Sequence, residues 1–166
     1  ELRQQNGRAV VLRQLDELNA KAAALNRDST QLRLDPTLAI PAYIRKVDFH
    51  CMPGGYITEH AAEDVSAAAN YDIGIFATTG GGLGRYNDGA GHAVAHWLQT
   101  HASTLKPKRI LDLGCGLGHS LLPVAEAYPD ADIIAIDVAA PLLRFAHARA
   151  RSMGVNNITF VQANAE

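Results

Sequence analysis

A glycine-rich turn in the last third of the chain is the segment best suited to hold a ligand. Residues 110–118 read ILDLGCGLG, a short apolar strand that runs into three alternate glycines. Because glycine has no side chain, the main chain can approach a bound molecule closely there, and the amides of the following helix face it. Asp137 ends the next apolar run, DIIAID, where its carboxylate can accept hydrogen bonds from both hydroxyls of a ribose. The two features predict a site for an adenosine-like ligand at the carboxyl edge of a parallel sheet.

The spacing of the glycines separates two ligand classes. Dinucleotide-binding folds use G-x-G-x-x-G, because a pyrophosphate sits on the end of the helix. Gly114, Gly116 and Gly118 have the spacing G-x-G-x-G and follow Asp112. This arrangement resembles the first motif, D-x-G-x-G-x-G, of the class I S-adenosylmethionine-dependent methyltransferases. The phrases LLRFAHARA, TFVQANAE and PGGY look more narrowly like a bacterial, small-molecule-type group of these enzymes.

The resemblance implies S-adenosylmethionine as cofactor, with S-adenosylhomocysteine as product, and it implies a role for each matching residue. The three glycines would admit the methionine portion, and Asp112 would hold the turn or the cofactor's amino group, directly or through water. Asp137 would bind the ribose, with Val138 beside the adenine. Asn164, followed by Ala165, stands where such enzymes often have an acidic residue, and an amide oxygen can still accept the hydrogen bond of the adenine amino group. The expected cofactor-binding residues are Asp112, Gly114, Gly116, Gly118, Asp137, Val138, Asn164 and Ala165.

Short strands that alternate with helices must position these residues. Apolar runs at 109–114, 132–137 and 158–162 predict three parallel strands, near-continuous in Ile, Leu and Val, as expected when helices cover both faces of a sheet. Helices are predicted at about 119–128 and 141–153, with Pro141 in the first turn and Gly154 at a left-handed exit. The expected fold class is α/β, a Rossmann-like methyltransferase sheet with only its first three parallel strands present. Residues 106–166 would be the N-terminal half of a longer S-adenosylmethionine-binding domain, because the family sheet has more strands.

Residues 1–105 are expected to form a mainly helical region that acts as a lid. Apolar residues recur at spacings of three and four over residues 8–27, which predicts an amphipathic helix. Its apolar seam consists of Val11, Leu15, Leu18, Ala22 and Leu25. We expect the seam to pack on the chain's own body. The alternative is a homodimer, because the spacing also suits a two-stranded coil.

Proline and glycine divide the stretch that follows this helix. Asp35-Pro36 and Ile40-Pro41 break regular structure, since each proline fixes its own torsion and restrains the residue before it. Pro53-Gly54-Gly55 predicts a tight turn. Thr58 is expected to cap an alanine-rich helix that runs to about Asn70.

Glycines dominate residues 78–91, which indicates a loop that can order over a ligand. Helical spacing returns over residues 91–105. Tyr56, Tyr71 and Tyr86 flank the glycine-rich turns, where a lid would form a rim over the cofactor. Each of them is also the kind of amphipathic side chain that simply packs.

The sequence predicts no metal site. His92 and His96 lie four residues apart on a helix, but no third ligand accompanies them. A second set has no spacing typical of metal ligands and consists of His50, Cys51, Glu59 and His60. Cys51 and Cys115 are too far apart in sequence for a redox pair and are expected to be reduced.

Composition narrows the classes of protein and partner. Apolar residues make up 48% and charged residues 19%, a mixture typical of a folded globular protein. The formal net charge of −2 supplies no basic field for a nucleic acid backbone. No apolar run approaches the roughly 20 residues that span a bilayer, and the first residues do not resemble a secretory signal. We therefore expect a cytoplasmic protein with no membrane contact.

These observations favour an S-adenosylmethionine-dependent methyltransferase that acts on a small molecule. The sequence identifies no catalytic residue, since the acceptor site and any general base normally follow the third strand in such enzymes. One alternative is a non-catalytic module for cofactor binding or assembly. Another is an NAD(P)-dependent oxidoreductase, for which the glycine spacing is wrong.

Overall fold

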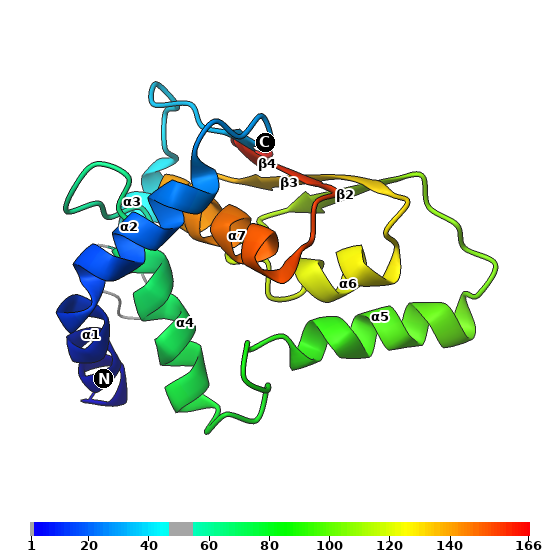
Figure 1. The fold of residues 1–166 in the computed structure, drawn as a ribbon, viewed down its shortest axis with the longest axis horizontal. Coiled ribbons are helices and arrows are strands. Elements are labelled where there is room, and N and C mark those ends of the chain that lie inside the picture. The colour runs from blue at the N-terminus through cyan, green and yellow to red at the C-terminus, as the bar shows by residue number, and fades with distance from the viewer. Residues whose placement is uncertain (1, 47–54) are drawn as a thin grey trace.

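The computed structural model describes residues 2–46 and 55–166, and its carboxy-terminal part alternates strands with helices (Figure 1). The order there is β2 (Arg109–Leu113), α6 (Leu121–Ala127), β3 (Asp132–Asp137), α7 (Ala140–Met153) and β4 (Ile158–Gln162). Neighbouring strands run parallel, in the order β1-β4-β3-β2. The three strands and two helices that the sequence predicts are therefore confirmed, with helix ends shifted by one or two residues.

The sheet also has a strand that the sequence does not predict. Strand β1 (Leu32–Arg33) pairs parallel with β4, and the Phe160 amide donates to the carbonyl oxygen of Gln31 at 2.7 Å. Two residues are too few for an alternating pattern, so this strand has no periodic signal. The sheet thus has four strands in the described part of the chain, one of them from the amino-terminal region.

The core lies on one face of the sheet. Ile133, Ala135 and Phe160 are fully buried on the side that carries α6 and α7 (Figure 1). On the opposite face, the side chains of Leu111 and Leu113 are 59% and 55% exposed. The expectation that helices cover both faces is therefore wrong for the described residues. A run of apolar residues shows that a strand is apolar on both sides, but it does not show that both sides are covered.

The amino-terminal helices pack against the carboxy-terminal part of the chain. They are α1 (Leu2–Arg13), α2 (Leu15–Asn26), α3 (Ala42–Lys46), α4 (Ser66–Thr78) and α5 (Gly89–His101). The predicted helix over residues 8–27 is broken at Gln14, and its seam packs on the chain itself. Val11 and Ala22 are buried, as α1 lies on α4 and α2 lies on α7. The packing expected for this seam is the one observed.

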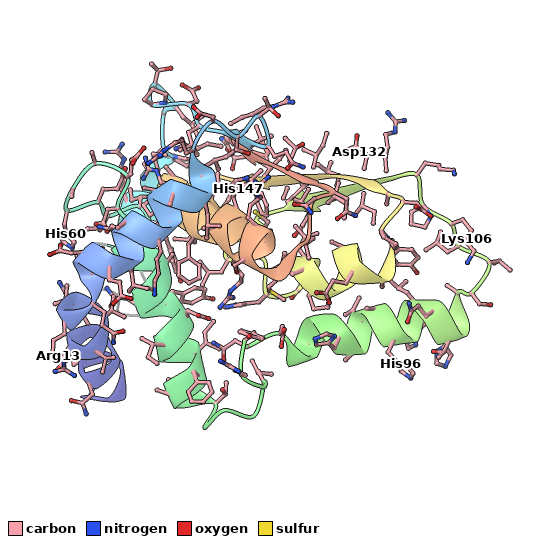
Figure 2. All side chains as sticks on the ribbon, viewed as in Figure 1. Arg13, His60, His96, Lys106, Asp132 and His147 are labelled. Carbon is pink, nitrogen blue, oxygen red and sulfur yellow. The ribbon has the colours of Figure 1, made fainter. Side chains whose placement is uncertain are left out.

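A buried histidine fastens the end of α2 to α7 (Figure 2). His147 is 1% exposed, and its Nδ1 and Nε2 atoms lie 2.7 Å from Asn26 Oδ1 and 2.8 Å from Ser29 Oγ. Asn26 also donates to the carbonyl oxygen of Arg144 at 3.1 Å. Burial, with a smaller contribution from the charge of Arg151, lowers the pKa of His147 to about 4. The imidazole is therefore neutral at pH 7 and acts as a structural hydrogen-bonding group.

Helix α4 begins later than the sequence indicates. Thr58 does not cap it, because the helix starts at Ser66, where the amide and hydroxyl groups donate to the Asp64 carboxylate at 2.7 and 2.8 Å. The Asp64 side chain is fully buried and also accepts a hydrogen bond from the His60 amide at 2.7 Å. The expected turn at Pro53-Gly54-Gly55 lies largely outside the described residues, although Gly55 has a positive φ of 72°. A threonine ahead of an alanine-rich run is therefore a misleading signal here, because the contacts of Asp64 with Ser66 and His60 mark where the helix begins.

Helix α5 lies beside α6 and starts where two segments come very close. A Cβ atom on Gly91 would lie 2.7 Å from the carbonyl oxygen of His119 and 2.8 Å from Ser120 Cα. Glycine is therefore required here for the approach of two backbones. His92 and His96 are exposed, and His96 lies on the side of α5 that faces away from α6 (Figure 2).

The described residues contain neither a metal-binding cluster nor a membrane-spanning helix. No three His, Cys, Asp or Glu side chains among residues 2–46 and 55–166 gather in a way that could hold a metal ion. His50 and Cys51 lie outside these residues. No helix in the same part of the chain is both long and apolar enough to cross a bilayer.

Candidate functional site

A cavity of about 310 Å³ lies at the carboxyl edge of the sheet. One part of its lining comes from the ends of β2, β3 and β4 and the segments that follow them. The other part comes from the amino-terminal region. Six of the eight predicted ligand-binding residues line it. They are Gly114, Gly116, Asp137, Val138, Asn164 and Ala165.

The glycine turn leaves open space beside its backbone. Gly114, Gly116 and Gly118 have φ angles of 77°, 53° and 75°, which side chains rarely permit. A Cβ atom on Gly114 or Gly116 would meet nothing within 4 Å, so it would project into empty space. The turn is held by the Ile136 carbonyl oxygen, which accepts from the amides of Gly114 and Cys115 at 2.7 and 3.0 Å. This rigid, bare stretch of main chain is suited to close contact with a ligand.

Asp137 joins the glycine turn to the end of β3. Its Oδ2 atom accepts a hydrogen bond from the Gly116 amide and its Oδ1 atom accepts one from the Ala139 amide, each at 2.9 Å. Each carboxylate oxygen has a second lone pair, so both can still accept a hydroxyl. Burial raises the pKa of Asp137 above its ordinary value, although the backbone hydrogen bonds oppose this. A ligand that donates hydrogen bonds to this carboxylate would stabilise its charged form, which burial disfavours.

Asp112 lies in β2, just before the glycine turn, and is not among the residues that line the cavity. Burial and, secondarily, the nearby charge of Asp137 raise the pKa of Asp112. Its carboxyl group makes no hydrogen bond within the described part of the chain. The Asp137 carboxylate in the cavity and the Asp112 carboxyl group near it together produce a negative potential, which favours a ligand with positive charge.

Gly118 also lies outside the cavity lining and has a packing role. A Cβ atom at this position would lie 3.3 Å from Leu122 Cγ. The glycine therefore lets the first turn of α6 approach the loop closely.

Tyrosines form the wall opposite the glycine turn. Of the three tyrosines for which the sequence leaves a rim or a packing role open, Tyr56 and Tyr71 line the cavity, and their rings meet edge to face with centroids 5.3 Å apart. Tyr86 does not line it, and neither does any other residue of the glycine-rich stretch 78–91. Tyr43 and Ile44 of α3 do line it, and sequence reasoning missed both. They have no local signal, because they reach the cavity only through the fold.

Cys115 lies within the turn but is not suited to be a nucleophile. Burial is the main reason that the pKa of its thiol is raised, and the charges of Asp137 and Asp112 raise it further. The reactive form of cysteine is the thiolate, which these surroundings disfavour. The site therefore offers no nucleophile of its own at the turn, and its features are those of a binding site.

Comparison with known proteins identifies the part of the chain that carries this turn. Residues 105–166 match a family model described as a methyltransferase domain. Over these residues the chain resembles the methyltransferase family. The matched segment contains β2, β3 and β4 and every residue that the sequence motif assigns to the ligand.

Individual relatives each match about a third of the chain. A tRNA (guanine-N(7)-)-methyltransferase of Chloroflexus aggregans is 42% identical over 55 residues, which are 33% of this chain and 25% of that protein. A trans-aconitate 2-methyltransferase of Afipia carboxidovorans is 40% identical over 60 residues, which are 36% of this chain and 22% of that protein. The chain thus spans about a quarter of the length of these curated relatives.

A solved structure resembles the chain over a greater length. It is coclaurine N-methyltransferase bound to N-methylheliamine and SAH, which is 17% identical with a TM-score of 0.39. The match covers 97% of this chain and 44% of that chain.

Proposed function

We propose that the protein is an S-adenosylmethionine-dependent methyltransferase and that the cofactor occupies the cavity at the carboxyl edge of the sheet. The observation that supports this most directly is that Gly114, Gly116 and the Asp137 carboxylate line the same cavity. Bare main chain suits the methionine portion of the cofactor, and a carboxylate at the end of the second motif strand suits its ribose. The match of residues 105–166 to a methyltransferase domain supports the same assignment.

Each side chain of the site then has a defined task. Asp137 accepts hydrogen bonds from the ribose hydroxyls, and Val138 packs beside the adenine. Asp112 accepts a hydrogen bond from the cofactor's ammonium group, directly or through water, which suits a carboxyl whose pKa is raised by burial and by Asp137. Asn164 offers its amide oxygen to the adenine amino group, with Ala165 beside it.

When bound, S-adenosylmethionine supplies a methyl group already activated by a positive sulfonium. The chain's own contribution is therefore alignment, electrostatic attraction and exclusion of water. Tyr56 and Tyr71, which line the cavity, would pack on the bound cofactor and help to exclude water from it. The negative potential of Asp112 and Asp137 favours the cofactor's cationic form.

We propose a small molecule as the methyl acceptor. The relatives include enzymes named for tRNA and for a small acid, so the two acceptor classes must be separated on other grounds. The net charge of −2 provides no basic surface of the kind that nucleic acid backbones require. We also propose that residues 1–105 form the lid region and residues 106–166 the first half of the cofactor-binding domain.

Calorimetry of the full-length protein tests the cofactor assignment. We expect it to bind S-adenosylmethionine and S-adenosylhomocysteine and not NAD. Asp137→Ala should weaken the binding of S-adenosylhomocysteine by about 1–3 kcal/mol, because the ribose hydroxyls lose their acceptor. The matched control is Asp132→Ala, which removes an exposed carboxylate from the other end of the same strand (Figure 2) and should leave affinity unchanged.

Three outcomes would contradict the proposal or part of it. Binding of NAD would favour an oxidoreductase. Binding of S-adenosylhomocysteine without methyl transfer to any of a panel of small acids, amines, phenols and tRNA would favour a non-catalytic module. Equal effects of Asp137→Ala and Asp132→Ala would show that the ribose is not held at Asp137.

A further inference from the structure

Neighbouring residues of helix α4 face two different surroundings. Tyr71 lines the cavity, whereas the carboxylate of Asp72 enters a group of polar side chains behind it. We call this group the Asp72 cluster; its members are Asp72, Asn87, His119 and Arg149. Asp72 itself does not line the cavity, so any influence on a ligand has to pass through other residues.

Asp72 accepts hydrogen bonds from three separate segments of the chain. Its Oδ1 atom lies 2.8 Å from His119 Nε2 and 2.9 Å from Asn87 Nδ2, and its Oδ2 atom lies 2.7 Å from Arg149 Nη2. Because an ionised carboxylate only accepts hydrogen bonds, His119 carries a hydrogen on Nε2. One side chain of α4 thereby connects the glycine-rich loop, the turn before α6, and α7.

The cluster is mostly withdrawn from solvent. Burial alone raises the pKa of Asp72, but the hydrogen bond from His119, the charge of Arg149 and the hydrogen bond from Asn87 together lower it below its ordinary value. Asn87 is 4% exposed, and its Nδ2 atom also donates to the Asp72 carbonyl oxygen at 2.9 Å. The carboxylate is therefore ionised at neutral pH and fully engaged, so its partners are held in fixed places.

His119 connects the cluster to the cavity. It directly follows Gly118, the last glycine of the turn, and its ring centroid lies 6.5 Å from that of Tyr71. The start of α5 supports the same segment from another side, because Gly91 leaves no room for a side chain against the backbone of His119 and Ser120. The turn and helix α4 are thus tied to each other at the place where they form opposite sides of the cavity.

We infer that Asp72 is a positioning residue of the cofactor site. Its hydrogen bond to His119 sets the separation between Tyr71 on α4 and the glycine turn, so that both contact the cofactor together. This inference rests on the proposed function, because it concerns the affinity of the same cavity for S-adenosylmethionine and its product. A cluster that only stabilised the fold would affect unfolding and leave the affinity of the folded protein unchanged.

Four variants of the full-length protein separate these two roles. Asp72→Asn removes the charge, and His119→Phe keeps a ring but removes the donor. His119→Gln is the conservative variant, since its amide nitrogen can replace Nε2 as a donor to Asp72. Ser29→Ala is the matched control, because it removes a hydrogen bond to the buried His147 in a network that contains no cavity-lining residue.

Calorimetric titration with S-adenosylhomocysteine, well below each melting temperature, is the measurement. We expect Asp72→Asn and His119→Phe to weaken binding at least tenfold, His119→Gln to stay within threefold of wild type, and Ser29→Ala to stay within twofold. Thermal unfolding is measured in parallel. If Asp72→Asn does not fold, the comparison of His119→Phe with His119→Gln decides the question.

The possible failures are distinguishable. Wild-type protein that binds no S-adenosylhomocysteine overturns the proposed function and this inference with it. Wild-type binding that Asp72→Asn and His119→Phe leave within twofold overturns the inference alone. Equal losses of affinity in His119→Gln and His119→Phe also overturn it, and so does a loss in Ser29→Ala as large as that in Asp72→Asn. In either case affinity would not depend on the hydrogen bond between Asp72 and His119.

Discussion

At the scale of single residues, the cavity exists because side chains are missing from the turn. Gly114 and Gly116 combine positive φ angles with open space on the side where a Cβ atom would project. These are two separate constraints. The backbone conformation affects stability wherever the glycine lies, whereas the open space affects binding only beside the cavity.

Gly116→Ala should show both effects. A left-handed conformation costs a residue with a side chain about 1–2 kcal/mol, so the free energy of unfolding should fall by about that amount. The new methyl group would also occupy the cavity and should weaken binding of S-adenosylhomocysteine at least tenfold. Gly154→Ala is a matched control for urea unfolding and calorimetry, because Gly154 has a φ of 77° and open space but does not line the cavity. An equal loss of affinity in both variants would contradict the assignment.

Asp112→Asn should improve stability and impair binding. Burial, together with the charge of Asp137, raises the pKa of Asp112 in the folded protein. The unfolded chain therefore loses this proton at lower pH, and folding becomes less favourable as pH rises from the ordinary value through the raised one. At pH 7 the variant should unfold at higher urea concentration than wild type, and the difference should shrink when both are measured below these pKa values.

The same substitution should weaken binding of the cationic cofactor about tenfold, because a charge-assisted hydrogen bond to its ammonium group is lost. Asp132→Ala, at an exposed position, serves as the control. A variant that is more stable and binds equally well would leave Asp112 without a role at the site.

At the scale of elements, the helices are placed by a few polar contacts between distant parts of the chain. His147 holds the end of α2 through Asn26 and Ser29, and Asp72 holds α4 to three other segments. These contacts join residues that are 15 to 121 positions apart. They therefore determine how the amino-terminal helices pack on the sheet.

Stability should fall in mildly acidic solution because of His147. Its pKa is about 4 in the folded protein and 6.5 ordinarily, so the unfolded chain binds more protons between these values. The contribution of the neutral histidine is complete above pH 6.5 and is lost as pH falls toward 4, up to about 3 kcal/mol. His147→Gln keeps a donor and an acceptor but has no proton to gain. Urea unfolding from pH 7 to pH 4 should show a steeper loss in wild type than in this variant, and parallel curves would contradict the assignment.

The elements that the sequence predicts best are those with strong local periodicity. The apolar runs of β2, β3 and β4 and the exit of α7 at Gly154 depend on neighbouring residues alone. Strand β1 depends on a distant partner, Phe160, so local patterns miss it. The amide of Val65, just before α4, likewise donates to a distant side chain, Asn19, which no local pattern indicates. Whether a face of the sheet is covered depends on other segments of the chain. The pattern of the strands therefore could not show that the face carrying Leu111 is exposed.

At the scale of the whole molecule, the cavity is built by residues from both halves of the chain. The motif residues Gly114, Gly116 and Asp137 line it as predicted, because turn and carboxylate follow adjacent strands. Its other wall contains Tyr43 and Tyr71, which lie far from the motif in sequence. The residues that local sequence singles out thus come together in one cavity, whereas the lining residues that tertiary packing adds have no local signal.

A ligand that touches both walls should stabilise both parts of the chain together. At a concentration of one hundred times its dissociation constant, S-adenosylhomocysteine should raise the free energy of unfolding by about 2.7 kcal/mol, and NAD should not raise it. Hydrogen exchange should slow in the glycine turn, residues 114–118, and also in α4 around Tyr71, because both contact the ligand. Protection confined to the turn would show that the tyrosine wall does not take part in binding, and the stabilisation would then have to arise from the methyltransferase domain alone.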